Sequence, residues 1–550
     1  MKNFRIGKQN AKAYKLAIVA LFVGLSAPAF AQAGSSKINF NANFDSGAIG
    51  KVELMQKKNI ISAHGDSIEH YRYNITTQKD APNPANPDLA PSNRWFYFLM
   101  SGVKGKEIAL DIDYNDSKRP VYSYNNVDFE RFSADEVPVE CKTITKTYTQ
   151  DSVYIAYYVP YNVEHNYKRI EDWSASKNVQ KFSIGESQEG RDLTMMVISN
   201  NLHSGLIPNA EGKLKYTSKD KKKKIIYIHG RIHPSETPAS WQLDGIIDIL
   251  AGNSQYAEDL RDNAIFYVLP FTNPDGVYGG MSRANPNGVN LEVNYNATAD
   301  KTAKEVKNIT NFLMSFYNSK LTPSLSLNMH SQIAPHITYW VHNAESTSFK
   351  YFSNVMLLAN LTIYNNPYFG KKDLSFSKVA PKYVEGWLYN RYKGKTLATT
   401  FETPYTYYQS DSTGVWVTPE NLKEQGINTV NAVNDLFALS KEARVVVNEP
   451  KRAAGTKAQK DNEHFYFGKS YLKSTEAGAM VKYKGELPTG KYDVYMWSVG
   501  AAENVSAEGK SEWVKIGEFT QNKSGKFRYN YISKKSGEMI DRALFVKKEL

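Results

Sequence analysis

Short apolar runs alternate with helical runs between about residues 166 and 448. The strand-like runs lie at 223–229, 264–271, 324–330 and 397–402, and the helical runs lie at 238–253, 303–318 and 420–437. Alternation of this kind predicts an α/β fold, with a mostly parallel or mixed sheet that helices cover. In such sheets a ligand binds beyond the carboxyl ends of the strands. The residues that end the apolar runs are therefore the first candidates for a functional site.

Three of these runs end in a residue that can bind a metal or a proton. His229, His330 and Glu402 each close a run, and His233 and Glu236 follow His229 in the next loop. We expect all five side chains to lie along one edge of the sheet.

A His-x-x-Glu pair such as His233 and Glu236 is a weak signal by itself. His342 and Glu345 form a second pair, and the plain interpretation of either is a surface histidine near a carboxylate. A catalytic zinc needs three protein ligands and one open position, and His330 is a suitable third ligand for the first pair.

Two further residues fit the chemistry of such a site. Glu402 could take a proton from water at the metal. Arg283, in a turn-rich loop between the ligands, is a fixed cation that could face a developing oxyanion.

These motifs, in this order, resemble those of the zinc carboxypeptidases of the M14 type. They are His233-Pro-Ser-Glu236, "NPDGV" at 273–277, Arg283, His330 and Glu402. The aromatic phrases "RWFYFLMSGVKGKEIALDI" and "VYIAYYVPYN" are similar to those of the cytosolic-carboxypeptidase subfamily, as is "SIGESQEGRDLTMMVIS" at 183–199. The resemblance spans roughly residues 90 to 440 and implies the family's α/β sandwich around a mixed sheet.

The resemblance also implies roles for the matching residues and one Zn²⁺ per chain. His233, Glu236 and His330 would bind the zinc, Glu402 would act as general base and then acid, and Arg283 would polarise the scissile carbonyl. With the ligand set complete, His229, His336 and His342 are expected to have supporting or structural roles.

The chain departs from the family where the substrate carboxylate is normally held. Where the family has an Asn-Arg pair, this chain has Glu292 and Val293. A free carboxylate that approached Glu292 without a compensating cation would be repelled. Alternatively, Glu292 is a loop acid that contacts nothing.

Three functions stay open at this point. In the first, the protein is a carboxypeptidase in which another cation, such as Arg391 or a lysine, binds the substrate carboxylate. In the second, Glu292 binds a cationic group, as on peptidoglycan stem peptides with a diamino acid. The third is a zinc-containing binding protein without turnover.

The first 31 residues have the pattern of a secretory signal peptide. Five basic residues precede an apolar run, which ends in the small-x-small sequence Ala29-Phe30-Ala31. We expect export to the periplasm or the medium and no membrane span after cleavage; a retained N-terminal anchor is the alternative. The single cysteine, Cys141, excludes an intramolecular disulfide and a cysteine metal site. The net charge of +12 includes the lysines at 221–224, which are typical of a solvated surface, so we expect no nucleic-acid partner.

Composition divides the rest of the chain into segments. We predict an N-terminal β domain at 32–165, the peptidase domain at 166–448, a linker at 449–462 and a small β-sandwich at 463–550. The last segment faintly resembles carbohydrate-binding-like sandwiches of exported bacterial enzymes, so a cell-wall or glycan partner is possible alongside the peptide substrate. Trp497 or Trp513 could stack on a sugar, although packing in the core is the commoner role of tryptophan, and the segment could equally be a spacer.

Overall fold

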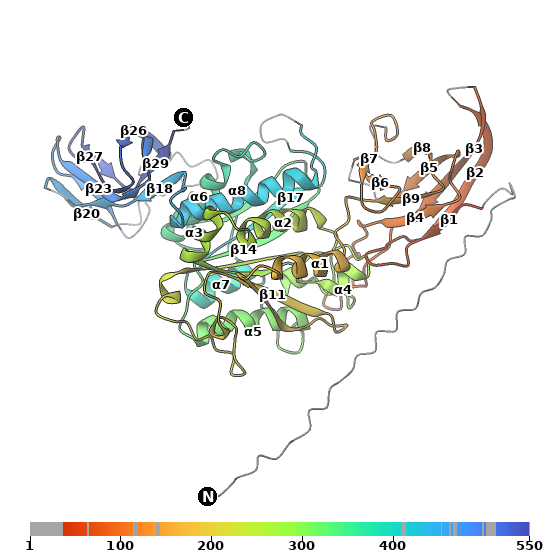
Figure 1. Ribbon diagram of the computed structural model, residues 1–550, viewed down its shortest axis with the longest axis horizontal. Coiled ribbons are helices and arrows are strands. Elements are labelled where there is room, and N and C mark those ends of the chain that lie inside the picture. Colours follow the sequence, from red (N-terminus) through yellow and green to blue (C-terminus); the bar gives the residue numbers. More distant parts are fainter. Residues whose placement is uncertain are drawn as a thin grey trace, which may run out of the picture. The chain divides into compact units, whose positions relative to one another are not determined.

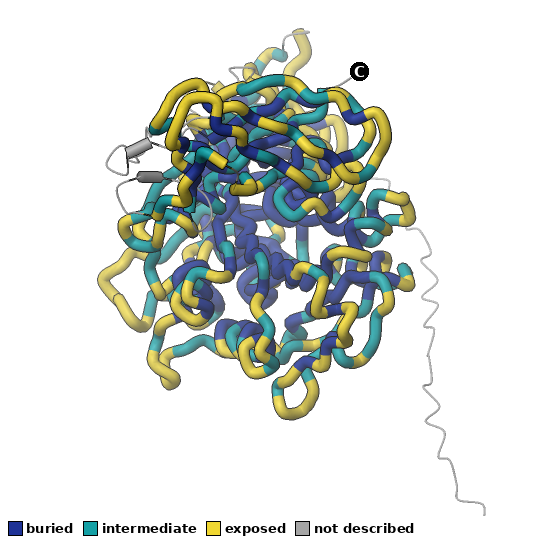
Figure 2. The backbone as a smooth tube through the Cα atoms, turned by 90° about the vertical axis from the view of Figure 1, so that its left-hand side faces the viewer, coloured by how far each residue is buried: buried dark blue, intermediate teal, exposed yellow. Residues whose placement is uncertain are grey.

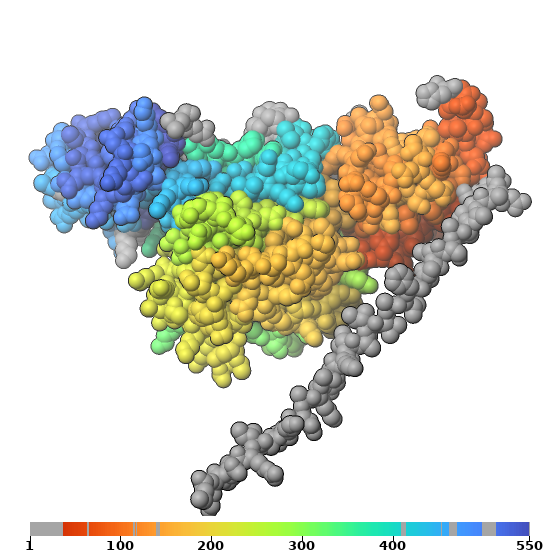
Figure 3. Space-filling model, in the orientation of Figure 1, coloured from red at the N-terminus to blue at the C-terminus, as the bar shows by residue number. Residues whose placement is uncertain are grey.

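The computed structural model describes residues 37–548, apart from 63–64, 114–115, 117, 139–142, 409–413, 453, 461–463, 466–469, 498–499 and 502–512. The predicted signal peptide and Cys141 lie outside the described residues. Successive segments of the chain keep to separate regions of surface, as the colours of Figure 3 show. None of the described helices is long and apolar enough to span a membrane.

Residues 39–156 form two β-sheets with a shared aromatic core. The strand orders are β1-β4-β9-β6-β7 and β2-β3-β5-β8. The strands are β1 (Asn39–Asn41), β2 (Val52–Ile61), β3 (Ser67–Ile75), β4 (Tyr97–Ser101), β5 (Glu107–Ile112), β6 (Val121–Ser123), β7 (Glu130–Arg131), β8 (Thr143–Thr147) and β9 (Ser152–Ala156). Phe96, Phe98 and Tyr157 are among the fully buried rings of this region.

An eight-stranded mixed sheet forms the centre of the molecule, in the order β10-β11-β13-β12-β14-β17-β15-β16. Its strands are β10 (Val179–Glu186), β11 (Asp192–Ile198), β12 (Lys224–Gly230), β13 (Ala264–Leu269), β14 (Leu325–Gln332), β15 (Thr338–His342), β16 (Leu374–Ser377) and β17 (Leu397–Pro404). The strands β13, β12, β14 and β17 run parallel to their neighbours within this set, whereas β10/β11, β11/β13 and β15/β17 are antiparallel.

Helices cover both faces of this sheet (Figure 1). They are α1 (Val163–Ser174), α2 (Thr237–Ala251), α3 (Gln255–Asn263), α4 (Pro274–Tyr278), α5 (Lys304–Asn318), α6 (Phe349–Ile363), α7 (Val384–Tyr392) and α8 (Pro419–Phe437), with short 3₁₀ turns at η1 (Ser204–Leu206), η2 (Asp220–Lys222), η3 (Leu291–Val293) and η4 (Lys371–Asp373).

The side chains of β12 alternate between two hydrophobic cores. Ile226 and Ile228 pack in the core that contains the apolar faces of α2, α6 and α8. Ile225 and Tyr227 pack in the core with the apolar faces of α5 and α7. Because both faces of the strand are covered, it reads as a continuous apolar run in the sequence. Figure 2 shows the buried backbone gathered in the interior and the exposed segments on the outer loops.

Two glycines allow α2 to pack closely against α8. A Cβ atom on Gly245 would lie 2.2 Å from the carbonyl oxygen of Lys423, and one on Gly426 would lie 2.3 Å from that of Gln242. Any larger residue would push the helices apart. The position of α2 matters because its first turn directly follows Glu236.

The last part of the chain forms further β-sheets around a separate core. Its strands are β18 (Val445–Asn448), β19 (Pro450–Lys451), β20 (Thr456–Gln459), β21 (His464–Phe465), β22 (Tyr471–Ser474), β23 (Met480–Leu487), β24 (Gly490–Trp497), β25 (Gly500–Ala501), β26 (Trp513–Gln521), β27 (Gly525–Ile532), β28 (Met539–Ile540) and β29 (Ala543–Lys547). The stretch 449–462, predicted as a linker, instead carries β19 and β20, which pair with β23 and β22. In addition, β18 pairs with β29. Residues 445–448, predicted as the end of the peptidase domain, are therefore paired with the C-terminal strands.

The predicted fold class is confirmed: an N-terminal β region, a mixed sheet covered by helices, and C-terminal β-sheets. The exact domain boundaries stay predictions.

Candidate active site

The carboxyl ends of three neighbouring parallel strands, β12, β14 and β17, meet at one edge of the central sheet. His330 on β14 and Glu402 on β17 are register partners, so the two residues are direct neighbours. His233 and Glu236 lie in the loop that joins β12 to α2. The strand order therefore brings together the residues that the sequence pattern singled out.

Arg231 shapes the loop that carries His233 and Glu236. Its backbone is in the left-handed region, with φ of 59°, and only 1% of the residue is exposed. Its guanidinium donates hydrogen bonds to the carbonyl oxygen of Pro234 at 2.8 Å, to that of Tyr161 at 2.8 Å and to the hydroxyl of Ser240 at 2.9 Å. A buried arginine thus ties the loop to α2 and to the segment before α1.

His233, Glu236 and His330 form a buried group suited to a metal ion. The Nδ1 atom of His233 lies 2.7 Å from Oε1 of Glu236, and Nδ1 of His330 lies 2.9 Å from Oε2 of the same carboxylate. Burial alone would raise the pKa of Glu236, but the two histidines hold it well below its usual range, so the carboxylate stays ionised. Among the residues that the structure describes, these form the one group of three or more His, Cys, Asp and Glu that could hold a metal.

The other ring nitrogen of each histidine lies near an oxygen atom. Nε2 of His233 lies 3.2 Å from Oδ1 of Asn290, and Nε2 of His330 lies 3.2 Å from Oε2 of Glu292. At His233 this contact is a hydrogen bond, which places the proton on Nε2 and leaves the Nδ1 lone pair for a metal, whereas Nε2 of His330 lies near the Glu292 carboxylate without hydrogen-bond geometry. The donor set of two nitrogens and one carboxylate is the kind that zinc takes in hydrolytic sites.

Glu292 lines the cavity and is buried, so it is not an exposed loop acid. Only 6% of it is exposed, and it accepts from the amide of Asn328 as well as contacting His330. Its carboxylate faces a metal ligand in addition to the cavity. Its effect on a substrate stays a prediction.

Glu402 lies beside the three ligands, with its carboxylate held by an indole. Nε1 of Trp340 donates to Oε1 of Glu402 at 2.6 Å. Burial raises the pKa of Glu402 to about 7, and the nearby charge of Glu236 acts in the same direction. A carboxyl group with such a pKa can both accept and return a proton near neutral pH.

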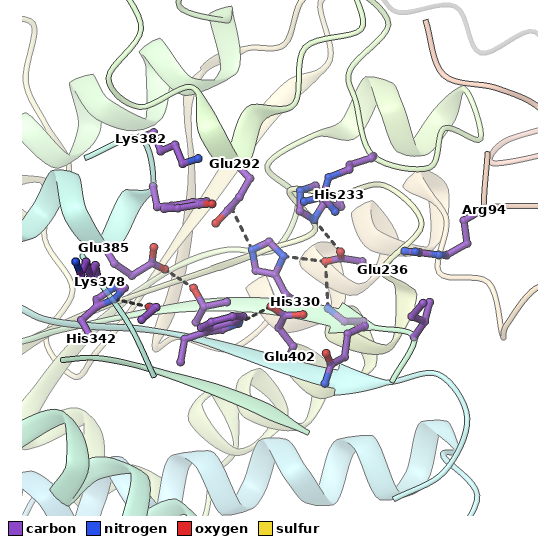
Figure 4. A pocket seen from close by; sticks show the side chains of 18 residues that line it. Arg94, His233, Glu236, Glu292, His330, His342, Lys378, Lys382, Glu385 and Glu402 are labelled. Carbon is purple, nitrogen blue, oxygen red and sulfur yellow. Dashed lines mark hydrogen bonds and ion pairs between the residues drawn. The ribbon is translucent and has the colours of Figure 1, made fainter. Parts of the chain in front are cut away.

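The ligands and Glu402 open into a cavity of about 560 Å³ (Figure 4). The residues that line it are Arg94, His233, Glu236, Arg283, Glu292, His330, Ser331, Gln332, Ile333, Trp340, His342, Ser377, Lys378, Lys382, Tyr383, Glu385, Thr400 and Glu402. Arg283, the predicted oxyanion partner, is thus brought to the metal site, whereas Val293 and Arg391 are outside this set of described residues. Arg391 instead lies over the rings of Tyr317 and Trp387.

The remaining histidines have other surroundings. His342 lines the cavity, but its Nδ1 atom contacts the hydroxyl of Ser377 at 3.1 Å and Glu345 is exposed, so the second His-x-x-Glu pair does not converge. His229 is fully buried, and burial lowers its pKa to about 4. Its Nδ1 atom lies 2.9 Å from the hydroxyl of Tyr227. His336 is partly buried in the turn after β14 and does not line the cavity.

Several residues of the site were not singled out from the sequence, and four of them contact the ligands or other charged groups or enter from another part of the chain. Trp340 and Glu385 lie on elements, β15 and α7, that it did not assign. Arg94 enters the cavity from the N-terminal β region. Asn290 stands two positions before Glu292 in the turn-rich loop that the sequence analysis singled out. Its place in that loop is the one sequence signal that could have indicated it.

The comparisons with known proteins agree with this geometry. Residues 171–432 match the zinc carboxypeptidase family, and residues 40–158 match the family described as cytosolic carboxypeptidase N-terminal domain. The first match covers slightly less than half of the chain, and together the two matches support a zinc carboxypeptidase with an N-terminal domain of the cytosolic type.

Similar proteins are found in animals and bacteria. Cytosolic carboxypeptidase 6 of Mus musculus is 25% identical over 439 residues, which cover 73% of this chain and 74% of that protein. The protein of the same name from Homo sapiens is 24% identical over 437 residues, covering 73% of this chain and 79% of its own.

Two solved bacterial structures share the fold. A metallo-carboxypeptidase from Burkholderia cenocepacia has a TM-score of 0.58 at 20% identity, covering 73% of this chain and 99% of its own. One from Pseudomonas aeruginosa, in complex with (2-guanidinoethylmercapto)succinic acid, has a TM-score of 0.54 at 18% identity, covering 73% and 99%.

The family matches and the ligand geometry decide one of the three open functions. The protein is a zinc-dependent peptide hydrolase, which excludes the alternative of a binding protein without turnover. Its zinc site is His233, Glu236 and His330. A peptide is the substrate that the family implies.

Proposed function

We propose that this zinc carboxypeptidase removes the C-terminal residue from exported or cell-wall peptides. One observation carries the proposal: the three ligands and Glu402 lie at one edge of the sheet and open into a single cavity. The signal-peptide pattern at residues 1–31 supports export.

Glu402 has the position and the pKa of the proton carrier. Bound zinc would acidify water and polarise the scissile carbonyl. The carboxylate of Glu402 takes the proton that water loses as its oxygen bonds to the carbonyl carbon. It then returns that proton to the amine as the C–N bond breaks, so the carboxylate is regenerated. The donor Trp340 keeps Oε1 oriented throughout.

Arg283 supplies the positive charge for the carbonyl oxygen. Negative charge grows on that oxygen as the carbonyl carbon becomes tetrahedral, and a guanidinium in the same cavity can donate hydrogen bonds to it. Arginine keeps its charge at every accessible pH, so this support does not depend on proton transfer.

The carboxylate of the substrate needs a cation that Val293 cannot supply. Arg391 is outside the cavity lining, whereas Lys378 and Lys382 are part of it. Both lysines are exposed and lie on the segment that enters α7. We assign the terminal carboxylate to Lys382, whose ammonium group lies 5.1 Å from the centre of the Tyr383 ring, and both lysines line the cavity (Figure 4).

A second candidate substrate presents a cationic group, such as the diamino acid of a peptidoglycan stem peptide. The observation in its favour is that Glu385 adds a second buried carboxyl group to the wall that contains Glu292. The amide of Asn328 donates to Glu292 at 3.3 Å and to Glu385 at 3.1 Å, so the two acids share one donor. An amine placed there would offset charge that the Asn328 amide and the Thr400 hydroxyl only partly compensate.

A glycan partner for the C-terminal sheets stays a prediction. Trp497 is only 3% exposed, and its ring packs edge-on against Trp513 with 5.1 Å between centroids. This packing supports a core role for Trp497 and leaves only the half-buried Trp513 for a sugar.

The test is hydrolysis of a peptide panel by zinc-loaded protein. The panel contains peptides with free C-termini, the same peptides amidated, and stem peptides that end in a diamino acid. Glu402→Gln should lose roughly 100- to 10,000-fold in kcat and keep its zinc. Release of single residues from free C-termini only, with KM raised by Lys382→Gln, would support the first substrate class. A preference for diamino substrates that Glu385→Gln removes would support the second, and no cleavage of any peptide would refute both.

A further inference from the structure

The loop that carries Arg283 runs from Gly279 to Ala284, immediately after α4. Arg283 itself is exposed to the cavity, whereas Ser282 and Ala284 on either side are buried. The backbone of the loop must therefore be fixed if the guanidinium is to meet one point in the cavity. Arginine has a long and flexible side chain, so a fixed Cα removes only part of its conformational freedom. The position of the Cα nevertheless sets the region that the guanidinium can reach.

A single carboxylate of the N-terminal β region accepts three consecutive backbone N–H groups of this loop. Oδ1 of Asp80 accepts from Ser282 at 2.7 Å, and Oδ2 accepts from Arg283 at 2.7 Å and from Ala284 at 2.8 Å. Hydrogen bonds to an ionised acceptor are shorter and stronger than neutral ones. Asp80 is 5% exposed, so these bonds lie away from competing water.

The pKa of Asp80 reflects the balance within this arrangement. Burial raises the pKa of Asp80 above its ordinary value, and the three amide donors reduce this rise without cancelling it. The loop thus supplies part of the solvation that the buried carboxylate has lost, and the carboxylate in return holds the loop.

Other contacts join the same two parts of the chain. The amide of Gln78 donates to the carbonyl oxygen of Gly279 at 2.8 Å, and the backbone N–H of Trp95 donates to the hydroxyl of Ser282 at 3.0 Å. Gly280 has φ of +62°, and a Cβ atom there would lie 2.4 Å from the carbonyl oxygen of Gly47. The loop is therefore fitted against the N-terminal β region along its whole length.

The loop is also tied to the segment that holds the metal ligands. The hydroxyl of Ser235, next to Glu236, donates to the carbonyl oxygen of Ser282 at 2.8 Å. Ser282 thus lies between Asp80 and the His233–Glu236 loop, so the distance from Arg283 to the metal site is set from two sides.

We infer that Asp80 is the positioning residue for Arg283, and that the N-terminal β region is in this way part of the catalytic unit. The inference rests on the proposed role of Arg283 in polarising the carbonyl. Without the carboxylate, the three amides lose their acceptor and the loop is held only by its contacts with Gln78, Trp95 and Ser235. A displacement of about 1 Å at a reacting group can cost about 100-fold in rate.

The test is a double-mutant cycle on kcat and KM with zinc-loaded protein. Arg283→Gln should lower kcat roughly 100- to 1,000-fold. Asp80→Asn should lower kcat about 10- to 100-fold, with KM changed less than about threefold and zinc retained, because Asn replaces one acceptor by a donor that faces an N–H group. The double variant should be no slower than Arg283→Gln alone, since both changes remove the same contribution.

Asp113→Asn is the matched control. Asp113 also accepts a backbone N–H, that of Thr77 at 2.8 Å, within the N-terminal β region, but it does not contact the Arg283 loop. Its replacement should leave kcat unchanged. If Asp80→Asn does not fold, Asp80→Glu is the substitute, because it keeps the charge and displaces it by one methylene. We then expect a smaller fall in kcat, again with little change in KM and with zinc retained.

The outcomes separate the two proposals. Normal kcat in Asp80→Asn together with a large loss in Arg283→Gln would overturn the role of Asp80 and leave the proposed function intact. Losses that multiply in the double variant would also overturn it, because Asp80 would then act independently of Arg283. Normal kcat in Arg283→Gln would instead refute the proposed role of Arg283. Amide hydrogen exchange at 282–284 adds a readout that needs no substrate: faster exchange in Asp80→Asn is expected, and unchanged exchange would contradict the inference.

Discussion

Glu292 lies against the metal ligand His330, with 3.2 Å between Oε2 and Nε2. The residue predicted to stand where the family has a carboxylate-binding asparagine therefore contacts the zinc site as well as the cavity. The two atoms are close without hydrogen-bond geometry, so the carboxylate acts on the imidazole as a nearby negative charge, which makes the other nitrogen a better ligand.

We expect Glu292→Gln to weaken zinc binding by about 10- to 100-fold, because the negative charge beside His330 is lost. Competition with a metal chelator at fixed pH measures the change. Glu345→Gln, in the exposed member of the second His-x-x-Glu pair, is the control and should bind zinc as the wild type does. Unchanged zinc affinity with an altered substrate preference would show that Glu292 acts on the substrate alone.

Trp340→Phe should move the acid limb of the pH–rate profile. Catalysis needs ionised Glu402, so kcat/KM falls as the pH drops through the pKa of this carboxyl group. The indole N–H stabilises the ionised form and lowers that pKa. Its loss should shift the limb upward by about one pH unit.

Trp173→Phe is the control for this shift. Its indole donates to the carboxylate of Asp248 at 2.7 Å, on α2 and outside the cavity. The limb should stay in place in that variant. A limb that also stays in place in Trp340→Phe would mean that Glu402 does not govern it.

Glu385→Gln should make the metal-free protein more stable at alkaline pH. Burial raises the pKa of Glu385 to about 7, and the charge of Glu292 adds to the effect. A carboxyl group with a raised pKa contributes stability below pH 4.5, and that contribution is lost as the pH rises to about 7. The amide has no proton to lose, so the variant should gain on the wild type by on the order of 3 kcal/mol between pH 5 and 8.

Urea unfolding at several pH values measures this difference in the free energy of unfolding. Glu211→Gln, at an exposed position, should follow the wild type across the range. A constant difference between Glu385→Gln and the wild type from pH 5 to 8 would rule out a raised pKa at this position.

Arg231→Ala should destabilise the fold by on the order of 3 kcal/mol. The change leaves the buried carbonyl oxygens of Pro234 and Tyr161 without their donor. Chemical denaturation measures the change in the free energy of unfolding. Arg391→Ala is the control: this arginine is exposed and lies over the Tyr317 ring, and its loss should cost about 0.5 kcal/mol or less. Equal losses in the two variants would argue against a structural role for the buried guanidinium.

The sequence was enough to predict the parts of the site that depend on residue type and strand order. His233, Glu236, His330 and Glu402 end apolar runs or follow them, and the parallel strands bring such positions together. Arg391 was a wrong suggestion for the substitute cation, because its place on the surface depends on how α7 lies against the sheet. Asp80 could not be predicted at all, since it recognises backbone amides, which every non-proline residue carries alike.

The hydrogen bonds between Asp80 and the Arg283 loop also limit how this chain can be recombined. A peptidase segment transplanted next to a foreign N-terminal domain would bring its metal ligands with it, because their contacts described here lie within the segment itself. It would leave behind the acceptor for three of its loop amides. Such a chimera is expected to bind metal and yet turn over slowly, so the N-terminal β region is not expected to be an interchangeable module.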